Sequence, residues 1–588
     1  MNQLDGYDGD GWLARVSRRR FLALVGLSAS ASLMAACQPA PPPAPKPTSA
    51  PAAAPGSAPA GVPTSAPAAA PAAQPTTAPA AAGRPGGELV VANLDEPVSL
   101  DPLNMNGFAL PAANLVYDRL VMLDNNLKVH PALADSWEAS PDGKAYTFKL
   151  KRNAKFHDGT PFNAEAVKSN LDRLTTPSLK GNFKINIGGF YERTEVVDEF
   201  TARVQLKQAF APFLFGLAEG LYAMVSPTAF QKFGKDYDRN PVGTGPFIFE
   251  EWVSKSHVAA RKNPDYNWAS SMFKHQGPAY LDRVSVRLIP DAQIRITTVE
   301  TGEVHFAVDI PPDQLTRLQQ VPKVQVISIS APGPSGKADL NARQPPLDDL
   351  RVRQAMNWAM DKEEMCKILF NGAFTPARTP LQPGTFGYDE SLSEIYPRTD
   401  LDKARQLLDE AGWKPGADGI REKDGKKLEV TVNIVSSSIQ ALPIKWAEVY
   451  QAQLREVGIQ YTPKQFDTAA LFATLTEGSE MVTFSPGSAS VDPDEFRSLL
   501  HSAFIGKSAA QRTGYKDPHL DELLEQGAAE QDQTKRKAIY REIQEIMLKQ
   551  ALIVPMWVRK NTYLQRDNVR DVIIDWQSWP GFYDAWLA

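Results

Sequence analysis

Val430-Thr-Val-Asn-Ile-Val435 is a run of β-branched and apolar residues, and a helical pattern from Pro443 to Val457 follows it. Proline is favoured in the first turn of a helix and glycine directly after the last one, and Gly458 ends this pattern. The stretch therefore predicts a strand followed by a helix. Because such strand and helix patterns alternate throughout residues 86–588, the sequence predicts an α/β fold.

The same reasoning predicts the other main elements. Period-two or β-branched runs predict strands, and apolar residues at helical spacing predict helices. The strands are expected at 88–92, 146–150, 202–206, 324–329, 481–484 and 553–558, and the helices at 350–360, 363–370, 401–411 and 533–549. Asp361 and Glu364 have the spacing of a helix capping box. Cys366, in the helix that follows, is expected to be a small buried apolar residue.

The segment 38–85 has a composition that opposes folding. It contains 15 Pro and 18 Ala, with Lys46 and Arg84 as its charges and no aromatic residue. Such a segment cannot bury enough apolar surface to offset the entropy of ordering. Its proline content favours an extended backbone with a reach of up to roughly 150 Å. We therefore predict a disordered tether.

Residues 1–36 have the features of a signal peptide. Arg18-Arg19-Arg20 precedes an apolar run from Phe21 to Ala36 that is too short to span a bilayer. Small residues before Cys37 resemble the lipobox of bacterial lipoproteins, in which the cysteine is acylated. Met34 stands where leucine is usual. Lipidation of Cys37 is predicted, with an ordinary cleaved signal peptide as the alternative. Export would follow the twin-arginine or the general route.

Charge and cysteine content limit the possible partners. The chain has 588 residues and a net charge of −5, and residues 86–588 alone carry −8. This acidic balance argues against a nucleic-acid partner. Cys37 and Cys366 are the only cysteines. If Cys37 carries lipid, no disulfide can form, so an exported chain must be stabilised by its core.

Familiar catalytic motifs are missing from the sequence. No two of the seven histidines lie within four residues of each other, so no zinc-binding helix motif is present. His157-Asp158-Gly159 reads as a turn rather than a metal site. Gly333–Lys337 lacks the first glycine and the final hydroxyl of a phosphate loop. We predict no metal or cofactor. A secreted hydrolase whose site is assembled from scattered residues remains an alternative.

Several short segments together resemble bacterial solute-binding protein family five, the extracytoplasmic receptors of ABC importers. The segments are Ser99-Leu-Asp-Pro102, Tyr117-Asp-Arg-Leu120, Pro131–Trp137, Lys155–Phe162, Val242-Gly-Thr-Gly-Pro-Phe247, 349–361, Ala404–Trp413 and Gln453–Ile459. They follow the family's order and span nearly all of residues 86–588.

The resemblance implies a two-lobe clamp of the type II periplasmic-binding-protein kind, with an additional third subdomain. The lobes are expected at about 86–130, 236–336 and 557–588 (lobe I) and about 337–556 (lobe II), with the extra subdomain at about 131–235. A monomer would bind a small solute between its lobes: a peptide, a modified peptide, an oligosaccharide or a metal chelate. It would deliver this solute to membrane permease subunits without covalent chemistry. A solute sensor that uses the same clamp is a further alternative.

The resemblance also implies candidate ligand-binding residues on both lobes. They are Asn106, Gly107, Phe108, Ser485, Gly487, Ser488, Trp557 and Arg559. Phe108 and Trp557 could instead belong to the core, and Arg559 could form a surface ion pair.

One position departs from the family's pattern. Peptide receptors of the family hold a free amine with an aspartate three residues before an acid-proline pair. Counting back from Asp492-Pro493, this position is Ala489. The departure predicts either a non-standard solute or another acid in the same role.

Overall fold

The computed structural model describes residues 86–176, 187–435 and 442–588. The predicted signal peptide, Cys37 and the tether lie outside the described residues. In the part of the chain that is described, no helix is long and apolar enough to cross a membrane.

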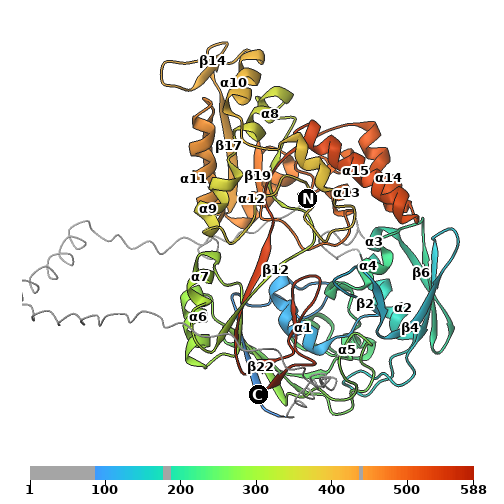
Figure 1. The fold of residues 1–588 in the computed structure, drawn as a ribbon. Coiled ribbons are helices and arrows are strands. Elements are labelled where there is room, and N and C mark those ends of the chain that lie inside the picture. Colours follow the sequence, from blue (N-terminus) through green and yellow to red (C-terminus); the bar gives the residue numbers. More distant parts are fainter. Residues whose placement is uncertain (1–85, 177–186, 436–441) are drawn as a thin grey trace, which may run out of the picture. The chain divides into compact units, whose positions relative to one another are not determined.

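The first of three large sheets has seven strands and contains the first strand of the described chain (Figure 1). In order across the sheet they are β12 (Val324–Ser330), β21 (Lys560–Arg566), β11 (Phe306–Val308), β1 (Glu88–Asn93), β10 (Arg283–Leu288), β9 (His257–Lys262) and β8 (Phe247–Val253). β1 is parallel to both β10 and β11. One face packs on α6 (Ala292–Thr301) and α7 (Leu315–Leu318), and the other faces the largest core cluster, which includes α1 (Leu110–Val116).

The second sheet is antiparallel and has the order β4-β5-β7-β6. Its strands are β4 (Ala134–Ala139), β5 (Ala145–Leu150), β6 (Tyr191–Asp198) and β7 (Thr201–Leu206). The helices of this region are α2 (Ala164–Asp172), α3 (Ile187–Phe190), α4 (Phe213–Leu217) and α5 (Pro227–Phe233). Asn163 and Ser226 cap α2 and α5 by accepting a backbone N–H with their side chains.

The third sheet has five strands in the order β18-β17-β19-β13-β20. The strands are β13 (Gly336–Leu340), β17 (Glu429–Val435), β18 (Gln460–Phe466), β19 (Val482–Ser485) and β20 (Ile553–Trp557). β17 and β18 are parallel, and α11 (Leu442–Arg455) connects them, which confirms the predicted strand and helix. The buried Trp446 and Tyr450 pack α11 against the sheet.

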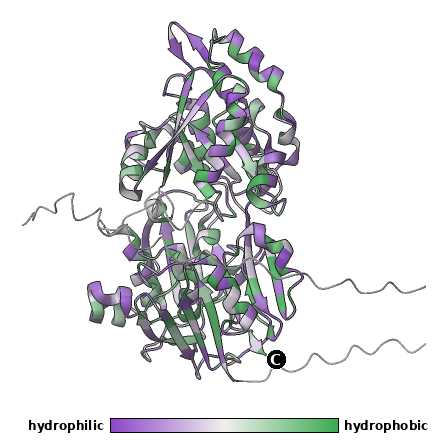
Figure 2. Ribbon diagram, turned by 90° about the vertical axis from the view of Figure 1, so that its left-hand side faces the viewer, coloured by the Kyte–Doolittle hydropathy of each residue, from purple (hydrophilic) through white to green (hydrophobic). Residues whose placement is uncertain are grey.

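Helices enclose the third sheet. They are α8 (Leu350–Ala359), α9 (Lys362–Phe370), α10 (Leu401–Glu410), α12 (Thr468–Glu477), α13 (Glu495–Leu500), α14 (Pro518–Ala529) and α15 (Gln533–Lys549). Figure 2 shows apolar and polar residues side by side along these helices, as one-sided burial requires. The predicted cap is present, since the Asp361 carboxylate accepts the Glu364 N–H. Cys366 is free and buried, as expected.

Two short segments connect the first sheet to the third. Residues 331–335 lead from β12 to β13, and residues 558–559 lead back from β20 to β21. β12 and β21 are antiparallel neighbours in one sheet, and β13 and β20 in the other. The chain therefore crosses twice at one place, and we call these two segments the crossing segments.

The glycines of Val242–Phe247 have a packing role. A Cβ atom on Gly243 would lie 2.1 Å from the Val116 carbonyl oxygen, which only glycine avoids. The His157 ring contacts the Gly245 carbonyl oxygen at 2.9 Å from Nε2, and Gly159 has a φ of +83°. The His157–Gly159 segment is thus the predicted turn, docked on this glycine-rich segment.

Candidate functional site

The loop after β19 is packed against the first crossing segment. Gly333 has a φ of +135°, and a Cβ atom there would lie 2.2 Å from the Ser488 carbonyl oxygen. A Cβ atom on Gly487 would lie 2.9 Å from the Pro334 carbonyl oxygen. The Ser490 N–H donates to the Pro332 carbonyl oxygen. The two backbones touch because glycine is present on both sides, and this contact positions the loop.

Arg559 joins the second crossing segment to this loop. Its Nη1 donates to the Gly487 carbonyl oxygen at 3.2 Å, and its backbone N–H donates to Gln382 Oε1 at 2.7 Å. Its side chain is partly exposed, and burial lowers its pKa. It forms no ion pair with any residue in the described ranges, so its guanidinium keeps donors available.

Ser488 orients a carboxylate at the same loop. Its hydroxyl lies 2.9 Å and 2.8 Å from the two carboxylate oxygens of Glu495, the first residue of α13. Glu495 is partly exposed. Burial raises its pKa, while the Ser488 hydrogen bond and the nearby Lys337 and Arg512 oppose that effect. The Ser488 hydroxyl thus holds the Glu495 carboxylate, which belongs to the 337–556 region, near the solvent.

Glu219, between α4 and η4 (Gly220–Tyr222), is a second carboxylate, and the charge of Glu495 acts on it. Burial raises the pKa of Glu219 to about 8, and the Glu495 carboxylate is the next largest contribution. Arg119 acts in the opposite direction, and Asp492 adds a further increase. Glu219 is partly accessible to solvent even though protein surrounds it. It is therefore a recessed acid that is mostly protonated at neutral pH.

Arg119 is a recessed cation beside Glu219. A Cβ atom on Gly220 would lie 3.1 Å from its Nη2 atom, and this atom donates to Asn114 Oδ1 at 2.8 Å. Burial lowers its pKa, and the carboxylates of Asp575, Asp118 and Glu219 oppose this. In residues 86–176, 187–435 and 442–588, no carboxylate is near enough to form an ion pair with it.

The charges of these groups influence one another, and we call this set of residues the charged ring. Asp575 and Arg559 both influence the hydroxyl of Tyr563, whose pKa burial raises. The ring therefore connects Arg559 and Tyr563 to Asp575, and Asp575 to Arg119. Through Glu219 it reaches the 485–495 loop. Its members are Arg119, Glu219, Ser488, Glu495, Arg559, Tyr563 and Asp575. Its members come from segments near all three sheets, and of these Arg559 and the loop that carries Ser488 lie at the crossing segments.

The predicted residues at 106–108 lie next to Trp579, in the C-terminal segment that also contains Asp575 of the charged ring. Gly107 begins η1 (Gly107–Ala109) and is exposed, and a Cβ atom there would lie 3.4 Å from the Trp579 ring. Asn106 is partly buried, and its Oδ1 has no partner among the described residues. The side chain of Phe108 lies outside the described residues.

The other predicted residues differ in accessibility. Ser485 and Ser488 are partly exposed, and Gly487 is buried at the crossing segment. Trp557 is only 1% exposed and packs against Phe370 and Phe484 in a core cluster. A Cβ atom on Gly336 would lie 2.3 Å from its Nε1 atom. Trp557 is therefore a core residue in this structure, in agreement with the alternative interpretation.

Ala489 is partly exposed beside Ser488, and the acid of the following acid-proline pair is not free. Asp492 forms a buried ion pair with Arg536, with both N–O distances 2.7 Å. The acid nearest to Ala489 that remains partly accessible on this loop is Glu495.

Sequence reasoning did not identify Arg119, Glu219, Glu495 and Asp575 as site residues. Arg119 stands in the quoted stretch Tyr117–Leu120, and Glu495 follows the acid-proline pair, so both positions carried a signal. Glu219 and Asp575 lie in ordinary loops with no motif. Only the three-dimensional fold brings them together.

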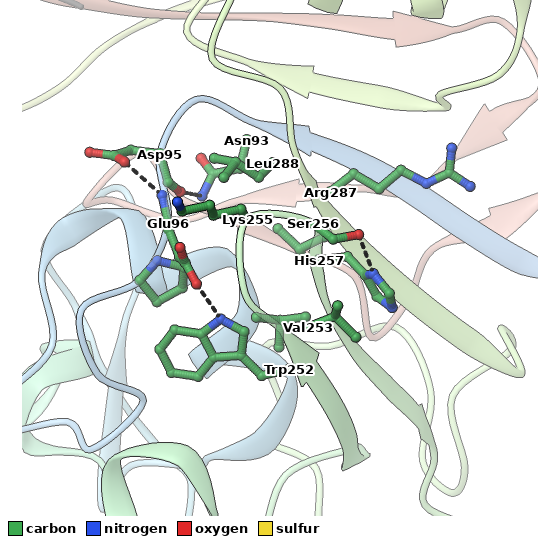
Figure 3. A pocket seen from close by; sticks show the side chains of 13 residues that line it. Asn93, Asp95, Glu96, Trp252, Val253, Lys255, Ser256, His257, Arg287 and Leu288 are labelled. Carbon is green, nitrogen blue, oxygen red and sulfur yellow. Dashed lines mark hydrogen bonds between the residues drawn. The ribbon is translucent and has the colours of Figure 1, made fainter.

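A small pocket lies elsewhere, at the edge of the first sheet (Figure 3). Glu96 Oε1 accepts a hydrogen bond from Trp252 Nε1 there. Its cavity of about 10 Å³ is at the lower limit for one water molecule. No member of the charged ring lines it, so we do not assign it to solute binding. Among the described residues, no group of three or more His, Cys, Asp or Glu could hold a metal ion.

Comparison with known proteins gives the family. Residues 128–507 match the model described as bacterial extracellular solute-binding proteins, family 5 middle. The chain is 31% identical over 483 residues to the glutathione-binding protein GsiB of Salmonella choleraesuis, covering 80% of this chain and 89% of that protein.

Solved structures give the same architecture. NikA from Brucella suis, in complex with Fe(III)-EDTA, has a TM-score of 0.76 and 27% identity, covering 85% of this chain and all of that one. The periplasmic binding protein DppA from Helicobacter pylori, in complex with the peptide STSA, has a TM-score of 0.71 and 27% identity, covering 86% and 98%. The fold is therefore that of the type II periplasmic binding proteins, and the chain belongs to the family 5 bacterial extracellular solute-binding proteins.

Proposed function

We propose that this protein is the extracytoplasmic receptor of an ABC importer, and that it binds a peptide-like solute at the charged ring and passes it on unchanged. A lipid on Cys37 would hold it at the outer face of the cytoplasmic membrane, and residues 38–85 would be the tether. It acts as a monomer and needs no cofactor.

The charged ring is the observation that supports this proposal. It joins residues on both sides of the two crossing segments, where small backbone rotations can move one sheet region relative to the other. A solute that contacts Arg119 on one side and the Ser488 loop on the other binds the closed arrangement better. Differential affinity of this kind shifts the population toward closure.

The solute class follows from the chemistry of the ring and from the relatives. A peptide-like solute has amine and carboxylate ends, and the ring offers carboxylates together with guanidinium donors. GsiB is named for glutathione and the Helicobacter pylori DppA structure holds a peptide. We therefore place a modified peptide of the glutathione type first, ahead of an oligosaccharide or a metal chelate.

A thermal-shift screen of the purified chain from residue 86 onward tests the proposal. Glutathione, trialanine, a nickel–histidine complex and maltotriose are the probes. The protein should be stabilised by at least one of the two peptides, in proportion to the logarithm of its concentration above the Kd. Mass spectrometry should recover that probe intact. Chemically altered probe would favour the hydrolase alternative, and stabilisation by the chelate or the sugar alone would contradict the peptide assignment.

A matched pair of variants tests the location. Arg119→Met should lower peptide affinity at least tenfold, since it removes the guanidinium that faces the ring. Arg405→Met, on the exposed side of α10, should leave affinity unchanged. Equal affinities for both variants would exclude the ring as the site. For the anchor, Cys37→Ser should move the protein from the membrane fraction to the soluble fraction.

A further inference from the structure

A third segment of the chain lies against both crossing segments. Residues 373–385 follow α9 and precede η7 (Glu390–Ile395), and they form neither a helix nor a strand of a sheet. Phe374 belongs to the core cluster that includes α11, and Leu381 belongs to the cluster formed by α13, α14 and α15. The segment is therefore anchored in the region of the third sheet, and we call it the strap.

The strap is hydrogen-bonded to the first crossing segment. The Gln382 N–H donates to the Gly333 carbonyl oxygen at 2.9 Å, and the Gly333 N–H donates to Thr385 Oγ1 at 2.6 Å. The Ser335 N–H donates to the Pro380 carbonyl oxygen at 2.9 Å. All five residues are buried, so these bonds are shielded from water and hold the segment firmly.

The strap is also hydrogen-bonded to the second crossing segment. The Val558 N–H donates to the Thr375 carbonyl oxygen at 2.8 Å, and the Arg559 N–H donates to Gln382 Oε1 at 2.7 Å. Gln382 is completely buried. It therefore joins the two crossing segments, with its backbone bonded to the first and its side chain bonded to the second.

The backbone that lies between the strap and the first sheet is short. The pairing of the first sheet ends at Ser330, which lies opposite Lys560 on β21. Between this pair and the bonds of the strap lie Ala331 and Pro332 on one segment, and the link from Arg559 to Lys560 on the other. A hinge consists of a few residues that absorb a change in backbone torsion. A rotation that keeps the buried hydrogen bonds of the strap must therefore take place at these two points.

A side chain spans the second of these points. Lys560 Nζ donates to the Ala373 carbonyl oxygen at 2.8 Å. A lysine side chain is long and flexible, so this contact can follow a small rotation without fixing the backbone.

We propose that the strap makes both crossing segments part of the third-sheet region, and that Gln382 locks the two segments to each other. Rotation between the sheet regions is then confined to Ala331–Pro332 and to the Arg559–Lys560 link. The Arg559 guanidinium keeps its contact with Gly487 throughout this rotation. The inference rests on the proposed function and adds the place of the motion and the residue that restricts it.

Amide hydrogen exchange, measured by mass spectrometry on the full chain without solute, tests the strap. In the unmodified chain the amides of Gly333 and Arg559 should exchange as slowly as those of β13. Gln382→Leu removes the acceptor of the Arg559 N–H, so this amide should exchange about tenfold faster. Gln544→Leu is the matched control and should leave both amides slow. Like Gln382, Gln544 is completely buried, with one amide atom hydrogen-bonded and the other without a partner among the described residues.

The distance between the sheet regions tests where the motion occurs. Glu303→Cys and Lys426→Cys place spin labels on exposed positions of the first-sheet and third-sheet regions. Cys37→Ser removes one natural cysteine, and Cys366 is buried and stays unlabelled. Double electron–electron resonance without solute should give a broader distribution of label distances in Gln382→Leu, because its second crossing segment is no longer held. The control variant should reproduce the distribution of the labelled parent chain.

The outcomes separate this inference from the proposed function. Exchange of the Gly333 and Arg559 amides as fast as in exposed loops of the unmodified chain would overturn the strap and leave the receptor function standing. Equal label distributions in Gln382→Leu and its parent would do the same. Failure of every solute probe to bind would overturn the receptor function and leave the strap standing, because both measurements are made without solute.

A second variant keeps the proposal testable if Gln382→Leu does not fold. Thr385→Val has almost the same shape and removes the acceptor of the Gly333 N–H. The Gly333 amide should then exchange about tenfold faster, and an unchanged rate would overturn the proposal. A far-ultraviolet circular dichroism spectrum identical to that of the unmodified chain would show that a variant is folded.

Discussion

Asp492 and Arg536 form a buried bidentate ion pair, with 2.7 Å between each nitrogen and its carboxylate oxygen. The pair ties the loop that carries Ser488 and Glu495 to α15. Arg536 also donates to the Gly527 carbonyl oxygen. The acid of the acid-proline pair is thus a structural residue, and the position of the ring's loop depends on it.

Loss of this pair should destabilise the protein strongly. Arg536→Ala leaves an uncompensated buried carboxylate, which typically costs about 3 to 5 kcal/mol. Urea denaturation measures the change. The control is Arg541→Ala on the same helix, whose partner Asp389 is partly exposed and whose loss should cost about 1 kcal/mol or less. Similar losses in the two variants would contradict the structural role of Asp492.

The fold could be predicted because its signals are local. The run at Val430 became β17 and the pattern from Pro443 became α11, since strand and helix periodicity depend on near neighbours. The boundaries moved by one or two residues, as at α9, which begins at Lys362 rather than Glu363.

The site could be predicted only in part. The loop at Ser488 was a candidate because the resemblance places a cleft segment after the strand at 481–484. Glu219 was not a candidate, because its pKa depends on Arg119 and Glu495, which are distant in sequence. Burial also gives Glu219 its unusual pKa, and burial of an acid in a loop has no sequence pattern.

Gly333 should be essential to the first crossing segment. Gly333→Ala combines a strained φ with a contact 2.2 Å from the Ser488 carbonyl oxygen, so the loop must move. We expect a cost of at least about 2 kcal/mol and weaker solute binding. Gly277→Ala is the matched control, because Gly277 has a φ of +97° and open space around it. If the two variants lose equal stability, the contact between residue 333 and the Ser488 carbonyl oxygen does not contribute to the loss.

Trp557 should act through the core. Trp557→Ala removes a side chain that packs on Phe370 and Phe484, and should cost about 3 to 5 kcal/mol in unfolding free energy. The milder Trp557→Phe should fold and keep the solute affinity within about threefold. A large loss of affinity in Trp557→Phe at unchanged stability would instead place the indole in contact with the solute.

Glu219 should make the free protein less stable as pH rises. Its pKa is about 8 in the folded chain and close to 4.5 in the unfolded chain, so the folded state binds the extra proton between these values. Stability falls with pH wherever the folded state binds more protons. The contribution is therefore fully present below about pH 4.5 and is lost as pH approaches 8.

The Glu219→Gln variant isolates this effect, because glutamine keeps the neutral form at every pH. Relative to the unmodified chain it should gain up to about 4 kcal/mol between pH 5 and pH 9. Chemical denaturation at a series of pH values without solute gives the difference. Asp118→Asn is the comparison, since burial raises the pKa of Asp118 only to about 6 and its effect should level off at lower pH. A constant difference between the unmodified chain and Glu219→Gln from pH 5 to pH 9 would show that Glu219 is ionised in the folded protein, because a carboxylate with an ordinary pKa contributes no slope in this range.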